Sequence, residues 1–271
     1  MKELFKRSIT GILYAFLLLA AAFLSTDAFD FLFLAFGLIC LYEFKKLIRL
    51  SGYYIFIGFL ALWWVFIYLL GGIKNELYLT MLLLLFTLTI DIVLIYKLFS
   101  NKKNNYTNAQ KFLISLLYIG GGCIFLTMIP YRQAHFAKFL IIDIFILIWI
   151  NDTFAYIVGR SIGRTKLYEK ISPKKTVEGF IGGLIFSLVA AYFISKYNDD
   201  LNLTQWLILT SVVVIAGSLG DLIESKFKRL AGVKDSGAIL PGHGGLLDRL
   251  DSLVFAAPFA YLTIQIFHYV S

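Results

Sequence analysis

Long apolar runs dominate this chain of 271 residues and limit it to one class of fold. Nine such runs cover residues 9–25, 28–42, 54–72, 77–96, 112–130, 139–158, 177–195, 206–222 and 253–270. A helix that crosses the hydrocarbon core of a bilayer needs roughly 20 consecutive, mostly apolar residues. The runs show no alternation of apolar and polar positions, which argues against a β-barrel. We therefore predict an all-α integral membrane protein with about nine transmembrane helices.

The composition supports this class. Hydrophobic residues make up 59% of the chain and charged residues 15%, with a mean hydropathy of +0.80. A soluble domain is roughly 45–50% apolar and about 25% charged. These values exclude a disordered, collagen-like or disulfide-scaffold protein. Cys40 and Cys123 both lie inside apolar runs, so the sequence predicts neither a disulfide framework nor a thiolate metal site.

The distribution of basic residues predicts the orientation. With the N-terminus in the cytoplasm, 21 of the 25 Lys and Arg residues fall in cytoplasmic segments. The four on the outer side are Lys74, Arg132, Lys138 and Lys196. Because cytoplasmic loops of membrane proteins carry an excess of Lys and Arg, we expect the N-terminus inside and the C-terminus outside. The expected location is the cell inner (cytoplasmic) membrane, with several passes.

Two further expectations concern the organisation of the chain. The first run follows Lys2, Lys6 and Arg7 and could be a signal peptide, but eight more runs follow without a clear cleavage site, so we favour a retained signal anchor. Most polar residues lie in segments 151–179 and 217–252. We therefore expect residues 1–138 to be membrane scaffold helices and residues 139–271 to be a catalytic membrane region with two large cytoplasmic loops.

The segment from Asp221 to Ser252 carries most of the candidate chemistry. Its five acidic and five basic side chains would form a solvated, self-neutralising face in an ordinary loop. Asp221, however, closes an apolar run, where a charge without a function is costly. Asp248 and Asp251 are three positions apart at a helix start and so share a face. A glycine-rich turn at residues 241–245 lies between these acids, and its bare backbone can approach an anion closely.

Carboxylates beside cationic side chains and a glycine-rich turn suit phosphoryl or nucleotidyl transfer. Hard oxygen ligands bind Mg²⁺, the metal bridges phosphate oxygens, and cations neutralise the remaining charge. The sequence contains no Walker P-loop, dinucleotide-binding glycine fingerprint, zinc-ligand set or nucleophile elbow. His243 lies in the same turn, where a backbone hydrogen bond and a phosphate contact are equally compatible with its position.

The residues of this loop resemble the signature of the phosphatidate cytidylyltransferase (CDP-diacylglycerol synthase) family. The similar stretches are Ser225-Lys226-Phe227-Lys228-Arg229, Lys234-Asp235-Ser236-Gly237 and Leu240-Pro241-Gly242-His243-Gly244-Gly245-Leu246-Leu247-Asp248-Arg249-Leu250-Asp251. Two other stretches are similar to further family segments: residues 152–164, with Asp152, Gly159 and Gly163, and residues 172–179. The resemblance covers about the second half of the chain, whereas the first half matches only in being hydrophobic.

Residues 172–179 also have a local interpretation. Ser172 can cap a helix with Pro173 at its first position. Lys174 and Lys175 would then lie beside free backbone N–H groups, which form an anion site. An ordinary basic loop is the alternative, and we accept it for Arg160, Lys166 and Lys170. For Lys174 and Lys175 we favour phosphate binding.

The resemblance implies transfer of CMP from CTP to phosphatidate, giving CDP-diacylglycerol and pyrophosphate in phospholipid biosynthesis. The active site would face the cytoplasm and use Mg²⁺, with a second cation (K⁺ or another divalent ion) left open. Expected metal ligands are Asp221 and Asp248, with Asp251 and Asp152 as further candidates; Asp221, Asp248, Lys234 and Arg249 would be catalytic. The expected substrate contacts are Ser172, Lys174, Lys175, Lys226, Lys228, Arg229, His243, Gly244 and Gly245.

Other functions remain as alternatives. A related enzyme could use CTP with a different lipid phosphate, or phosphorylate a polyprenol. Intramembrane carboxylates also occur in ion-coupled transporters, but those usually contain inverted repeats, and this sequence shows none. The expected partners are CTP, phosphatidate and the lipid bilayer. No nucleic acid is expected, and a homodimer is left open.

Overall fold

Helices follow the nine apolar runs of the sequence. The computed structural model describes residues 2–70, 76–100, 106–132, 135–242 and 244–270. Within these residues the helices are α1 (Lys2–Leu24), α2 (Thr26–Leu47), α3 (Tyr54–Trp63) continued by η1 (Trp64–Leu69), α4 (Glu76–Phe99), α5 (Asn108–Ile114) continued by η3 (Ser115–Gly121) and α6 (Gly122–Met128), α7 (Lys138–Ile162), α8 (Val177–Ile194), α9 (Leu203–Ala231) and α10 (Leu247–Val270). The segments η1 and η3 are π-helical.

Six of the helices in the described residues are long and apolar enough to cross a membrane. They are Leu77–Phe99, Asn108–Met128, Lys138–Ile162, Val177–Ile194, Leu203–Ala231 and Leu247–Tyr269. Thr10–Leu24 and Tyr54–Leu69 form shorter apolar helices. The chain is therefore an all-α, multi-pass membrane protein, while the count of nine spans and their orientation stay predictions.

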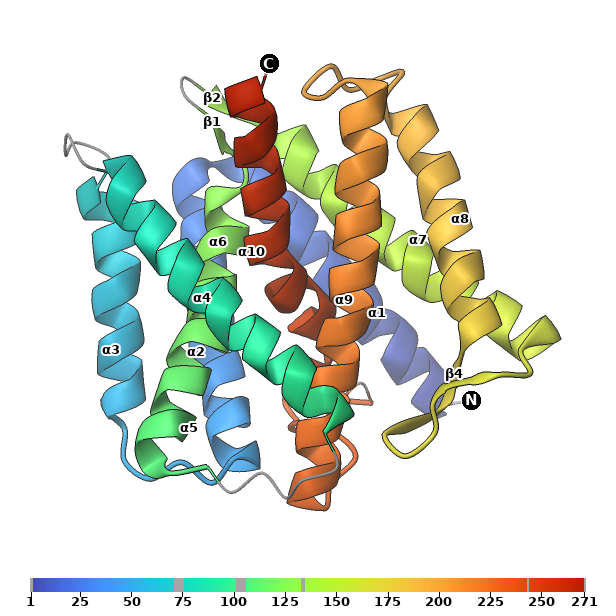
Figure 1. Ribbon diagram of the computed structural model, residues 1–271, viewed down its shortest axis with the longest axis horizontal. Helices are drawn as coiled ribbons and strands as arrows, with labels where there is room; N and C mark the ends of the chain where they lie inside the picture. Colours follow the sequence, from blue (N-terminus) through green and yellow to red (C-terminus); the bar gives the residue numbers. More distant parts are fainter. Residues whose placement is uncertain (1, 71–75, 101–105, 133–134, 243, 271) are drawn as a thin grey trace.

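The helices form one bundle with a continuous hydrophobic core. In Figure 1, α9 and α10 lie side by side, α7 and α8 form a neighbouring pair, and α4 crosses in front of α2 and α6. The ring of Phe44 on α2 packs against the rings of Tyr118 and Phe227, which joins the first half of the chain to α9. The two chain ends lie at opposite ends of the bundle. The β3–β4 hairpin and the α9–α10 connection lie at the same end as the N-terminus.

Glycines let the two helix pairs approach closely. A Cβ atom at Gly183 of α8 would lie 2.5 Å from Oδ1 of Asn151 on α7. A Cβ at Gly220 of α9 would lie 2.8 Å from the carbonyl oxygen of Asp251 on α10. Small residues at helix contacts are common in membranes, where van der Waals packing rather than the hydrophobic effect holds helices together. These contacts place Asp152, which follows Asn151, and Asp221, which follows Gly220, along the two helix interfaces.

The structure overturns the expected helix start at Ser172. Residues Ser172–Thr176 form strand β4, which pairs with β3 (Lys166–Tyr168) in an antiparallel hairpin. Helix α8 begins at Val177, and the side chain of Thr176 caps it by accepting the Gly179 N–H at 3.1 Å. The carboxylate of Glu178 holds the hairpin in place by accepting the backbone N–H groups of residues 164 and 165. A second hairpin joins β1 (Tyr131–Arg132) and β2 (His135–Phe136) at the opposite end of the bundle.

Candidate active site

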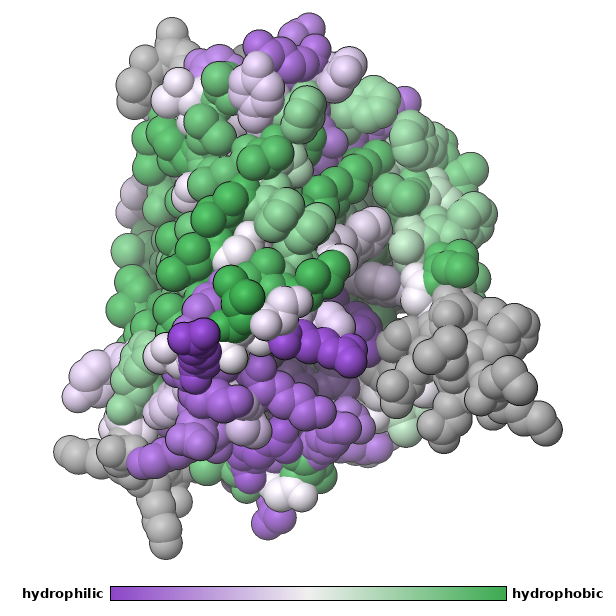
Figure 2. Space-filling model, turned by 90° about the vertical axis from the view of Figure 1, so that its right-hand side faces the viewer, coloured by the Kyte–Doolittle hydropathy of each residue, from purple (hydrophilic) through white to green (hydrophobic). Residues whose placement is uncertain are grey.

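A cleft of about 910 Å³ opens among α1, α7, α8, α9, α10 and the β3–β4 hairpin. Its volume lies within the range of about 300–1,000 Å³ that is typical of small-molecule sites. Polar side chains on its wall include Asn151, Asp152, Lys175, Asp221, Arg249 and Asp251, and apolar ones include Tyr14, Ala15, Trp149, Leu167 and Phe180. Figure 2 shows that hydrophilic side chains gather below the apolar belt on this side of the molecule. The cleft thus combines charged groups with an apolar wall.

The centre of the cleft is an ion pair between Lys175 of β4 and Asp221 of α9. The Ser225 hydroxyl, one turn further along α9, donates to Oδ1 of Asp221 at 3.2 Å. Burial favours the neutral amine of Lys175, but the nearby carboxylates, with Asp221 the strongest among them, together outweigh this effect and raise the pKa of Lys175 above its ordinary value. The lysine is therefore a fixed positive charge at neutral pH.

Asp152 and Asp251 bring two more carboxylates to the same cleft. Both lie close enough for their charge to act on the Lys175 ammonium. Asp251 is only 7% exposed, so its carboxylate has lost most of its contact with water. Like charges that lie close together repel one another unless a cation lies among them. In this structure the Lys175 ammonium is the cation beside these carboxylates.

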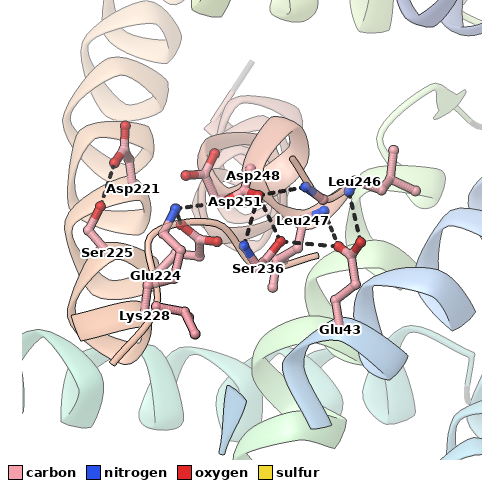
Figure 3. Close-up of polar contacts among 12 residues, drawn as sticks. Glu43, Asp221, Glu224, Ser225, Lys228, Ser236, Leu246, Leu247, Asp248 and Asp251 are labelled. Atoms are coloured by element: carbon pink, nitrogen blue, oxygen red, sulfur yellow. Dashed lines mark hydrogen bonds and ion pairs between the residues drawn. The ribbon is translucent and has the colours of Figure 1, made fainter. Parts of the chain in front are cut away.

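Asp248, in the first turn of α10, has a different set of partners (Figure 3). Its Oδ1 accepts a hydrogen bond from the Lys228 ammonium at 2.6 Å. Lys228 also forms an ion pair with Glu224, which lies one turn earlier on α9. Its Oδ2 accepts the N–H groups of Ser236 at 2.9 Å and of Gly245 at 2.7 Å. Asp248 therefore holds the glycine-rich loop to the start of α10 and to Lys228. Asp221 and Asp248 both line the cleft, but among the described contacts they have no hydrogen-bond partner in common.

Glu43, on α2, is a site residue that the sequence interpretation missed. The residue is 1% exposed, and its carboxylate accepts hydrogen bonds from the N–H groups of Leu246 at 3.2 Å and Leu247 at 2.8 Å. The Ser236 hydroxyl lies 3.2 Å from its Oε2. The available signal was an acidic residue between Tyr42 and Phe44 at the end of an apolar run, where an unused charge is costly. Treating residues 1–138 as scaffold hid that signal.

The basic residues of the signature are distributed over several places. The Lys226 ammonium donates to the carbonyl groups of residues 97, 98 and 100 at the C-terminal end of α4, away from the cleft. The Arg229 guanidinium donates to the carbonyls of Ile171 at 3.4 Å and Val233 at 3.1 Å. Favourable contact between a cation and the free carbonyls of a helix end is a common stabilising feature. In the described contacts, Lys226 and Arg229 therefore hold chain segments together.

The remaining predicted residues do not lie together in the cleft. Lys174 lines it and is exposed, whereas Ser172 is not among the described residues of its wall. Lys234 and Gly244 line an adjoining hollow of about 590 Å³, and Arg249 contributes to both spaces. Gly245 contributes its backbone N–H to Asp248. His243 lies outside the described residues.

The donor chemistry of the cleft fits a hard divalent cation. Asp152, Asp221 and Asp251 offer only carboxylate oxygens, which are the ligands Mg²⁺ prefers. In the described part of the chain, no group of three acidic, histidine or cysteine side chains is already arranged to hold a metal ion. Asp152, Asp221 and Asp251 would be the residues that hold such an ion, and the ion would supply positive charge for phosphate oxygens. At Asp248 it would have to displace Lys228.

This multi-pass helical membrane protein has a cleft that combines carboxylates, lysine and arginine with an apolar wall, which are the features of a membrane-embedded site for an anionic ligand. The model of the cytidylyltransferase family matches residues 5–267 of the chain. The chain belongs to the cytidylyltransferase family.

Three similar proteins come from staphylococci, and each is named phosphatidate cytidylyltransferase. The one from Staphylococcus saprophyticus is 44% identical over 178 residues, which are 65% of this chain and 66% of that protein. Those from Staphylococcus haemolyticus and Staphylococcus aureus are 46% and 44% identical over 169 residues, 62% of this chain and 63% of each relative. The matched region thus spans just under two thirds of the length of these relatives.

Proposed function

We propose that this protein transfers CMP from CTP to phosphatidate and releases pyrophosphate, producing CDP-diacylglycerol for phospholipid biosynthesis. The observation that carries the proposal is the cleft itself, in which Lys175 and Arg249 lie among four carboxylates at one end of a membrane bundle. The names of the staphylococcal relatives support the choice of reaction and substrates. The loop signature at residues 225–251 supports it as well.

The chemistry requires positioning and charge neutralisation. An oxygen of the ionised phosphatidate phosphate attacks the α-phosphorus of CTP, and the bond between that phosphorus and the oxygen bridging to the β-phosphate breaks. The electron pair leaves with pyrophosphate. Because an ionised phosphate monoester is already nucleophilic, no strong general base is needed, and the rate gain comes from holding the two substrates in line and stabilising the developing charge.

The side chains of the cleft supply these functions. Lys175 and Arg249 bind phosphate oxygens and offset the charge of two anionic substrates, and the exposed Lys174 adds a weaker, solvated positive charge at the rim. Asp221, together with Asp152 and Asp251, would hold Mg²⁺, which would neutralise the CTP phosphates and make the pyrophosphate a better leaving group. Asp248 would join this set only after releasing Lys228. The proposal also includes a second cation, K⁺ or a divalent ion, and assigns no ligand residues to it.

The location of the cleft suits a lipid acceptor. Tyr14, Trp149 and Phe180 form part of its apolar wall, on which the hydrocarbon near the lipid headgroup can lie. CTP is a cytoplasmic nucleotide, so we further propose that this end of the bundle faces the cytoplasm, in the inner membrane of the cell. The excess of Lys and Arg in the loops of this end supports that orientation.

A direct assay tests the proposal. Purified protein in mixed micelles, given labelled CTP, phosphatidate and Mg²⁺, should form labelled CDP-diacylglycerol and pyrophosphate in equal amounts. Replacing phosphatidate with other lipid phosphates in parallel reactions, and with a polyprenol in the presence of CTP, tests the alternative acceptors. Turnover with a different acceptor and none with phosphatidate would contradict the proposal.

A further inference from the structure

We propose that Glu43 is a positioning residue for the active site, because it fixes the loop and helix start that carry Asp248. Only the expected changes in kcat and KM rest on the proposed function. Glu43 lies on α2, in the half of the chain that the family signature does not reach, and its contacts bridge 193 to 204 positions of sequence. Figure 3 shows its carboxylate pointing from α2 toward the start of α10.

The contact satisfies a need that every helix start has. The first N–H groups of a helix lack partners within the helix and must find acceptors elsewhere. At the start of α10, the side chain of Glu43 accepts hydrogen bonds from the backbone N–H groups of Leu246 and Leu247. Both leucine residues are buried (3% and 0% exposed). A negative charge at a helix N-terminus also interacts favourably with the helix dipole. Glu43 thus acts as a helix cap supplied by another helix.

Ser236 couples this cap to Asp248. The Ser236 hydroxyl lies 3.2 Å from Oε2 of Glu43 and 3.0 Å from Oδ2 of Asp248. A hydroxyl has one proton and can donate it to only one of the two carboxylates at a time. The Ser236 backbone N–H stays on Asp248 in either case. A shift of Glu43 therefore changes the hydrogen bonding of Asp248 through a single intervening side chain.

The same contact explains two glycines of the signature. A Cβ atom at Gly237 would lie 2.2 Å from Oε1 of Glu43, and one at Gly245 would lie 2.5 Å from Oε2. Both distances are far below van der Waals contact, so a side chain at either position would push the Glu43 carboxylate aside. The φ angle of neither glycine lies in the left-handed region. The space taken by Glu43 at Gly237, and by Glu43 together with the Ser236 hydroxyl (2.1 Å from the added Cβ) at Gly245, favours glycine there, rather than the backbone conformation.

Substitutions at Glu43 separate positioning from simple space filling. Glu43→Gln keeps the shape but turns one acceptor oxygen into an NH₂ group that faces an N–H donor. Glu43→Asp is one methylene shorter and cannot reach both backbone N–H groups. We expect kcat to fall about tenfold or more for Glu43→Gln and further for Glu43→Asp, with KM for CTP changed less than kcat. Glu169→Gln, at an exposed position, is the matched control and should leave both unchanged.

A second measurement does not depend on activity. Hydrogen–deuterium exchange of residues 236–247 should speed up at least tenfold in Glu43→Gln, while exchange in α7 and α8 stays at the wild-type rate. If the wild-type protein fails the cytidylyltransferase assay but Glu43→Gln shows this localised increase in exchange, the proposed function fails and the positioning role stands. Wild-type kcat and wild-type exchange in Glu43→Gln would overturn the positioning role.

Gly237→Ala keeps the inference falsifiable if Glu43 variants do not accumulate. This variant keeps glutamate at position 43, but the added methyl group displaces its carboxylate from the loop side of the contact with Ser236, Leu246 and Leu247. It should reproduce the loss of kcat and the faster exchange of residues 236–247. Normal kcat in Gly237→Ala would count against the proposal whatever the Glu43 variants do.

Discussion

Lys175 and Asp221 lie 46 positions apart in the chain, and their side chains form an ion pair that joins the β3–β4 hairpin to α9. The neighbouring Lys174 is exposed at the rim of the same cleft. Two lysines that appear equivalent in the sequence therefore have different surroundings. One is held among carboxylates at the centre of the cleft, and the other is free to move in solvent.

This difference predicts unequal effects of the two lysines on turnover. Lys175→Gln removes a cation fixed in the cleft, and loss of a charge-assisted contact costs about 1.5–3 kcal/mol, roughly tenfold or more in kcat/KM for CTP. Lys174→Gln removes a mobile, solvated charge and should change kcat/KM by less than about threefold. Steady-state kinetics of both variants in mixed micelles checks this. Equal losses in the two variants would show that burial in the cleft does not distinguish them.

Lys226 is predicted to contribute to stability rather than to substrate binding. Its ammonium donates to three carbonyl groups at the end of α4, so Lys226→Met should leave those carbonyls without their cation. Loss of hydrogen bonds from a charged donor costs about 1.5–3 kcal/mol. We expect a lower Tm in detergent and an unchanged KM for CTP. Lys170→Met, at an exposed lysine of the hairpin, is the control. A raised KM at normal Tm would restore Lys226 as a substrate contact.

Much of the helical architecture could be predicted because bilayer solubility imposes a length and a composition on each helix. Even residues 139–158, which contain Asp143, Asn151 and Asp152, form a single helix, α7. The start of α10 could also be predicted, since Asp248 and Asp251 both lie in its first turns. These features depend on local sequence only.

Long-range partners could not be predicted in this way. No local pattern indicates that Glu43 accepts the N–H group of Leu247, 204 positions away, because that contact depends on how α2 packs against α10. The cap at Ser172 was predicted wrongly for a related reason. A serine before proline suits a helix start, but pairing with β3 keeps residues 172–176 extended, and the equally suitable Thr176 caps α8 instead.

Orientation can be tested by labelling single cysteines. Because Cys40 and Cys123 are buried and unpaired, replacing both with Ala gives a suitable background. In intact cells, a cysteine at position 234 should resist a membrane-impermeant maleimide, while one at position 197 should react. Lys234 lies on the exposed α9–α10 loop, and Tyr197 is 88% exposed at the opposite end of the bundle. The reverse labelling pattern would invert the predicted topology.

The last prediction concerns the separate roles of Asp221 and Asp248. The sequence interpretation treats them as ligands of one cation, and both line the cleft, but their contacts differ. Asp221 is paired with one lysine and a serine hydroxyl, and no backbone N–H group donates to it among the described contacts. Asp248 holds Lys228 and two backbone N–H groups of the loop.

Replacement by Asn should therefore give two distinguishable results. Asp221→Asn should remove nearly all turnover and the binding of Mn²⁺, used as a spectroscopic substitute for Mg²⁺, while residues 232–246 keep their wild-type resistance to protease. Asp248→Asn should also remove turnover, but it should make this loop cleavable, because the amide cannot replace both charged oxygens. It also leaves Lys228 with Glu224 as its remaining acidic partner. If Asp248→Asn abolishes Mn²⁺ binding while the loop stays protease-resistant, Asp248 is a metal ligand in the same sense as Asp221, and its role in holding the loop is secondary.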